Sequence, residues 1–75
     1  MESKGDVTIQ IASDIDFDKL VAEIYYQGRF AGLISQDRSE LEFVFPEAHQ
    51  PASSMPLDRF IAALAEAKRE LIGNN

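Results

Sequence analysis

The chain has 75 residues, including 13 acidic and 7 basic residues, one histidine and no cysteine. This length has room for one hydrophobic core, so we expect a single domain over residues 1–75, ordered over about residues 7–72, without disulfides or cysteine-based chemistry. The formal net charge of −6 argues against nucleic acid and membranes as partners and favours a basic protein surface.

The first strand is expected at residues 7–13, where apolar and polar residues alternate as in a strand with one buried face. A hairpin follows, because residues 20–26 and 29–35 are rich in branched and aromatic side chains and flank a Gln-Gly pair at 27–28. Glycine there supplies the positive φ that a two-residue hairpin loop needs. Residues 41–45 alternate again and complete four antiparallel strands.

A two-residue loop determines the expected register of this hairpin. Tyr25 lies opposite Phe30, and the loop before the fourth strand sets Phe43 beside Leu33. One side of the sheet is then aliphatic and carries Leu20, Ala22, Ile24, Ala31 and Leu33. The other side is aromatic and carries Val21, Glu23, Tyr25, Phe30 and Ile34, with Glu42 and Val44 from the next strand.

The last element is an amphipathic helix, reached through a proline-flanked loop over residues 46–56. Its apolar residues recur every 3.6 positions, at Leu57, Phe60, Ile61, Leu64, Ala67 and Leu71. Asp58 in the first turn and Lys68 and Arg69 in the last turn suit the helix dipole, and Gly73 is placed to end the helix. The expected fold is therefore α+β: an antiparallel four-stranded meander with one C-terminal helix packed on one face, in the order ββββα.

Two features invite a test for metal binding or catalysis. Residues 14–18 place three aspartates at the spacing that begins a calcium loop, but the required glycine and glutamate are replaced by Lys19 and Tyr25. His49 is the only histidine and has no second partner that the sequence can place. We therefore interpret residues 14–18 as an acidic turn, and we expect no metal, no cofactor and no enzymatic activity.

The aromatic side of the hairpin is the expected binding surface, because a single helix covers only one face of the sheet. Aromatic side chains inside a charged rim are typical of protein interfaces. The expected partner-binding residues are Tyr25, Phe30, Glu23, Glu42, Ile34, Asp16 and Asp37. The alternative is that the two faces are the other way round, with the aromatic side in the core.

The segment EIYYQGRFAGLISQ at residues 23–36, together with PLDRF at 56–60 and the helix to Leu71, resembles small immunity proteins of bacterial contact-dependent and related polymorphic toxin systems. The resemblance extends over most of the chain from residue 20 onward. It implies a cytoplasmic antidote that binds a toxin domain, often a nuclease, and blocks its active site or substrate groove. These families diverge at the toxin-facing surface, so no binding residue is carried over from them.

The leading hypothesis is thus a cytoplasmic immunity protein, or antitoxin, that serves in bacterial competition by covering a basic toxin domain. Residues 1–6 lack the basic start of a signal peptide, and no apolar run reaches the length of a membrane span, which agrees with that location. The alternative is a small self-associating adaptor or structural subunit that pairs through an exposed strand edge or the aromatic face. The immunity protein itself is expected to be a monomer or a weak homodimer. A small hydrolase or metal enzyme is the third hypothesis.

Overall fold

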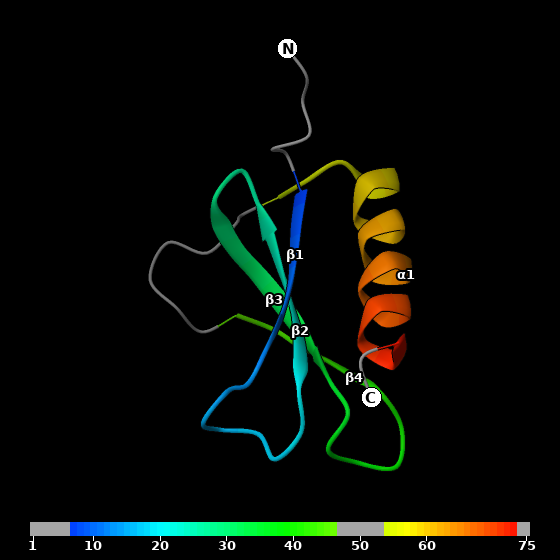
Figure 1. Cartoon of the computed structure of the whole chain (residues 1–75). Coiled ribbons are helices and arrows are strands. Elements are labelled where there is room, and N and C mark those ends of the chain that lie inside the picture. The colour runs from blue at the N-terminus through cyan, green and yellow to red at the C-terminus, as the bar shows by residue number, and fades with distance from the viewer. Residues whose placement is uncertain (1–6, 47–53, 74–75) are drawn as a thin grey trace.

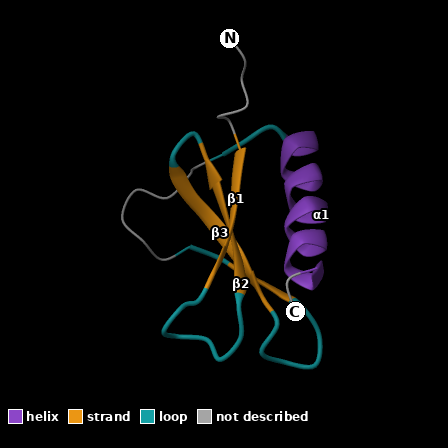
Figure 2. Ribbon diagram, in the orientation of Figure 1, coloured by secondary structure: helices purple, strands orange, loops and turns teal. Residues whose placement is uncertain are grey.

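The computed structural model describes residues 7–46 and 54–73. Its elements are β1 (Val7–Ala12), β2 (Val21–Tyr26), β3 (Arg29–Ser35), β4 (Glu42–Val44) and α1 (Leu57–Gly73). The strands form one antiparallel sheet in the order β1-β2-β3-β4. Helix α1 lies along one face of this sheet, and in the described part of the chain no helix covers the other face (Figure 1, Figure 2). The expected ββββα fold is confirmed.

The β2–β3 hairpin has the two-residue loop that the Gln-Gly pair predicts. Gln27 and Gly28 have φ angles of 51° and 80°. Positive φ at both central residues is the conformation whose twist matches that of the flanking strands. The register next to the loop is also as predicted, since Tyr25 lies opposite Phe30.

Beyond Tyr25 the register shifts by one residue, because a β-bulge inserts Ala31 into β3. Ile24 therefore lies opposite Gly32, whereas the predicted register places it opposite Ala31. Gly32 has a φ of 138°, a conformation that residues with a side chain rarely adopt. A Cβ atom at Gly32 would also lie 2.9 Å from the Val44 carbonyl oxygen. The bulge thus requires glycine at this position.

The bulge exchanges the faces of the next two residues of β3, because side chains alternate along a strand. Ile34 lies opposite Ala22 and belongs to the core under α1, whereas Leu33 lies opposite Glu23 on the other face. The predicted placement of Ile34 on the aromatic side and Leu33 on the aliphatic side was wrong.

The same shift continues into β4, where Phe43 lies opposite Ile34. The prediction that Phe43 sits beside Leu33 was therefore wrong as well. Phe43 faces the helix side, and its ring meets that of Phe60 edge-on, with centroids 5.8 Å apart. A second edge-on contact joins Phe43 to Phe45 at 5.1 Å.

The core lies between α1 and the sheet, mainly over β1 and β2. Its buried members are Ala22, Ile24, Ile34, Ala63, Ala67 and Leu71. Alanine at the two central helix positions lets the helix backbone approach the sheet closely. The alternation predicted for β1 is confirmed, since Val7, Ile9 and Ile11 all pack against this cluster.

The two ends of α1 differ in how well the sequence predicts them. The Pro56 carbonyl oxygen accepts the first helical hydrogen bond, from the Phe60 backbone N–H at 3.0 Å. The described part of α1 extends to Gly73. However, Lys68 and Arg69 lie before the last turn, which contains no basic residue, so their predicted position was wrong. The proline-flanked loop that precedes α1 lies partly outside the described residues, and His49 lies wholly outside them.

Candidate partner-binding site

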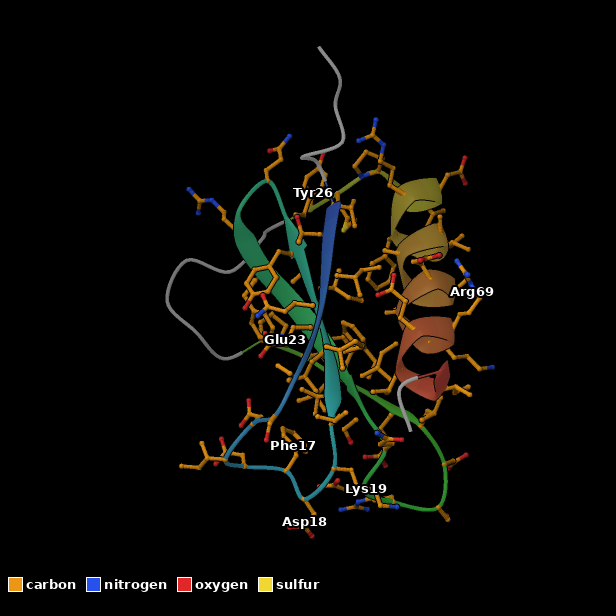
Figure 3. All side chains as sticks on the ribbon, in the orientation of Figure 1. Phe17, Asp18, Lys19, Glu23, Tyr26 and Arg69 are labelled. Carbon is orange, nitrogen blue, oxygen red and sulfur yellow. The ribbon has the colours of Figure 1, made fainter. Side chains whose placement is uncertain are left out.

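The face of the sheet opposite α1 contains a solvent-open depression, here called the sheet hollow, with a volume of about 560 Å³. Strands β2, β3 and β4 contribute to it, together with the loop that joins β1 to β2. It is lined by Asp14, Asp16, Phe17, Glu23, Tyr25, Phe30, Leu33, Val44 and Phe45. Figure 3 shows Glu23 on this side of the sheet, whereas Arg69 lies on the helix beyond the other face.

Two aromatic rings form part of the floor of the sheet hollow. Tyr25 and Phe30 are direct cross-strand neighbours, and their ring centroids lie 5.6 Å apart with the planes tilted by 57°. Both side chains are only partly buried, so each ring keeps some surface in contact with solvent. The predicted pairing of these two residues on the face away from the helix is confirmed.

Tyr25 also positions the nearest carboxylate. Its hydroxyl group donates a hydrogen bond of 3.1 Å to Oε1 of Glu23, which lies two residues earlier on the same strand. Burial raises the pKa of the Tyr25 hydroxyl above its ordinary value, and the hydrogen bond and the negative charge of Glu23 raise it further. Tyr25 therefore stays protonated at neutral pH and keeps donating to Glu23.

The β1–β2 loop forms the acidic edge of the sheet hollow. The Asp14 side chain accepts a hydrogen bond of 2.8 Å from the Asp16 backbone N–H, and the Asp14 carbonyl oxygen accepts one of 3.0 Å from Phe17. This is a tight turn of the kind that aspartate favours. The turn places Phe17 and both carboxylates at the hollow.

Asp37 has a structural role that the sequence does not reveal. Its two carboxylate oxygens accept hydrogen bonds of 2.9 Å each from the backbone N–H groups of Asp18 and Lys19. The β3–β4 loop thereby holds the β1–β2 loop, and both lie at the same end of the sheet (Figure 3). Asp37 does not line the sheet hollow, so it supports the predicted site from outside.

Two more of the predicted site residues lie outside the sheet hollow. Ile34 faces α1, so it cannot contact a partner on the open face; the bulge at Ala31 puts Leu33 on that face instead. Glu42 is partly exposed and lies 3.8 Å from the guanidinium group of Arg38, beyond the hollow.

Comparison with protein-family models, with curated proteins and with solved structures finds no match to this chain.

The electrostatic character of the sheet hollow follows from its own residues. The charged residues that line it are Asp14, Asp16 and Glu23, all of them acidic. Its remaining lining is apolar or aromatic, so the hollow joins a hydrophobic floor to a negative rim. Such a site suits a partner group that is both apolar and cationic.

Other kinds of site have less support in the described residues. Residues 7–46 and 54–73 hold no group of three or more histidine, cysteine or acidic side chains that could bind a metal ion. No helix within these ranges is long and apolar enough to cross a bilayer.

Proposed function

We propose that this chain is a protein-binding domain that acts as a cytoplasmic immunity protein. It neutralises a bacterial toxin domain by laying the open face of its sheet over the toxin's active site or substrate groove. In this proposal the chain contributes binding and performs no catalysis. The observation that carries the proposal is the sheet hollow, where Tyr25 and Phe30 stay partly exposed inside a rim of carboxylates.

The charge of the hollow supports a basic partner. A toxin that cleaves nucleic acid needs a positively charged groove to hold the phosphate backbone. A rim formed by Asp14, Asp16 and Glu23 complements such a groove and steers the two proteins together. The resemblance of residues 23–36 and of the helical segment to immunity proteins supports the same class of partner.

The experiment that tests this proposal is rescue of bacterial growth. Cells that express the toxin domain encoded beside this chain should survive when the chain is co-expressed. Double replacement of Tyr25 and Phe30 by alanine should abolish rescue, because truncating a central aromatic anchor commonly costs about 2 kcal/mol or more of binding free energy. Circular dichroism of the purified double variant should still show a folded α+β protein.

A matched control removes two apolar side chains from a different surface. Leu57 and Ile61 on α1 are 70% and 55% exposed and do not line the sheet hollow. Their double replacement by alanine should leave rescue intact. Loss of rescue only in this control would assign the interface to the helix, and full rescue by the folded Tyr25 and Phe30 variant would reject the sheet-face mechanism.

Self-association is the second candidate function, and one set of observations favours it. In the described residues the sheet has two edge strands, β1 and β4, and β4 is followed by Phe45, which is 75% exposed. An unpaired strand edge beside exposed apolar surface is a common route to dimers. Sedimentation of the purified chain distinguishes the two candidates, because an immunity protein should be a monomer or weak dimer and a structural subunit should form oligomers that persist on dilution.

A further inference from the structure

We propose that the sheet hollow receives an arginine side chain of the partner protein. This inference rests on the proposed function, which it deepens by naming the chemical group that the site recognises. Three properties of the hollow support it: an aromatic floor, an oriented carboxylate and an acidic loop held in place by a second loop.

The floor offers a surface on which a planar cation can stack. Tyr25 and Phe30 lie side by side with ring centroids 5.6 Å apart, and both rings line the hollow. The faces of aromatic rings carry negative potential and attract a guanidinium group within about 6 Å of the ring centre. Val44, which is partly exposed, extends the floor with aliphatic surface against which the methylene groups of an arginine stem can pack, and Leu33, which is 6% exposed, lies beneath this surface.

The carboxylates supply the hydrogen-bond acceptors that the cation needs. Glu23 is held by the Tyr25 hydroxyl through Oε1, which leaves its other oxygen free of that bond. Asp14 and Asp16 approach the same hollow from the β1–β2 loop. A guanidinium group directs its N–H donors in one plane, so it can stack on the rings while its edge donates to carboxylates around it.

The acidic loop is positioned before any partner arrives. Asp37 binds the backbone N–H groups of Asp18 and Lys19, and Asp14 binds that of Asp16. These bonds hold the loop whose two carboxylates line the same hollow as Glu23, although like charges repel. A cation in the hollow relieves that repulsion, and a pre-positioned site loses little conformational entropy on binding.

Arginine fits this arrangement better than lysine does. A lysine ammonium group is a compact, strongly hydrated charge that neither stacks on a ring nor bridges two carboxylates in one plane. The partly solvated rings and the spread of acids around the rim favour the broader and more weakly hydrated guanidinium group. The partner residue that enters the hollow is therefore assigned as arginine.

The test is an NMR titration of the ¹⁵N-labelled full-length chain with three blocked tripeptides. They have arginine, lysine or citrulline between two glycines, and citrulline is the neutral counterpart of arginine. The arginine peptide should shift the amide signals of the β1–β2 loop and of residues 23–30 in a saturable manner. Citrulline should bind about tenfold more weakly, because it lacks the charge that strengthens each hydrogen bond. Equal shifts with arginine and citrulline, or shifts spread over the whole surface, would overturn the proposal.

Variants of the chain locate the binding. Glu23→Gln should weaken arginine binding about tenfold, and Phe30→Leu about threefold through loss of one aromatic face. The matched control is Glu40→Gln, which neutralises an exposed acid outside the sheet hollow and should leave affinity unchanged. Equal weakening by Glu23→Gln and Glu40→Gln would show attraction to net charge alone and would contradict the site.

These results separate the arginine site from the immunity function. If the arginine peptide binds selectively but the chain gives no rescue from the neighbouring toxin, the site stands and the immunity proposal fails. If rescue depends on Tyr25 and Phe30 but the arginine peptide does not bind selectively, the interface stands and the arginine assignment fails. The comparison of arginine with citrulline uses the unaltered chain, so it tests the arginine assignment even where a variant does not fold.

Discussion

Replacement of Gly32 by alanine should destabilise the fold more than any other glycine substitution in the described residues. The new Cβ atom would lie 2.9 Å from both the Phe43 Cε1 atom and the Val44 carbonyl oxygen. Overpacking of this kind typically costs about 1–3 kcal/mol. The φ of 138° adds backbone strain of about 1–3 kcal/mol for a residue with a side chain. The expected loss is therefore about 2–6 kcal/mol.

That loss is large for a chain of 75 residues, whose whole free energy of unfolding is expected to be about 4–11 kcal/mol. Urea denaturation followed by circular dichroism measures this free energy directly. The dependence of the unfolding free energy on urea concentration should be the same in both proteins, as expected for two-state unfolding. Gly28→Ala and Gly73→Ala are the controls, since a Cβ atom at either place meets nothing within 4 Å. Gly28→Ala should cost about 1 kcal/mol because its φ is positive, and Gly73→Ala should be nearly neutral. A cost below about 1 kcal/mol for Gly32→Ala would refute the packing argument.

Three further outcomes are expected. Leu71→Ala should cost about 2–5 kcal/mol in the same denaturation assay, because this leucine is fully buried in a small core; a change below about 0.5 kcal/mol would contradict the position of α1. Asp37→Ala should speed hydrogen exchange of the two loop amides that it binds, leaving the rates in α1 unchanged. Ultraviolet titration should place the pKa of Tyr25 above its ordinary value, and Glu23→Gln should lower it. The pKa of Tyr25 is higher in the folded state than in the unfolded state. Its contribution to stability is therefore fully present below the unfolded-state pKa and is lost as the pH rises through the folded-state pKa.

The elements that the sequence predicts correctly are those determined by neighbouring residues. The Gln-Gly pair determines the hairpin loop by itself, and the 3.6-residue spacing determines the helix. The pairing of Tyr25 with Phe30 follows directly from the loop, since the two residues are the second pair from it. The open aromatic face could therefore be predicted, and with it the central part of the candidate site.

The remaining features depend on contacts between distant parts of the chain. The bulge at Ala31 lies where Phe43 packs over Gly32, and its local signal in β3 is Gly32 itself, because glycine inside a strand often marks a bulge or a close approach. The role of Asp37 depends on two amides that lie 18 and 19 residues earlier. Phe17 and Asp14 were missed as lining residues because the direction of the β1–β2 loop depends on those same bonds; their only local signal is an aromatic residue within a run of acids.

The bulge connects the stability of the core to the shape of the candidate site. If Ala31 were paired opposite Ile24 in a regular ladder instead of bulged, alternation would return Leu33 to the helix side and Ile34 to the open face. The Cβ-branched side chain of isoleucine would then replace that of leucine beside Glu23, and the core would lose a residue that now packs against Ala22. Deleting Ala31 removes the extra residue but keeps Leu33 opposite Glu23 and Ile34 opposite Ala22. This variant should therefore preserve both the core residue and the open face, which urea denaturation and partner binding can check. By contrast, Leu71 lies in the core on the helix side of the sheet. Leu71→Ala should therefore reduce stability while leaving the partner affinity of the folded fraction unchanged.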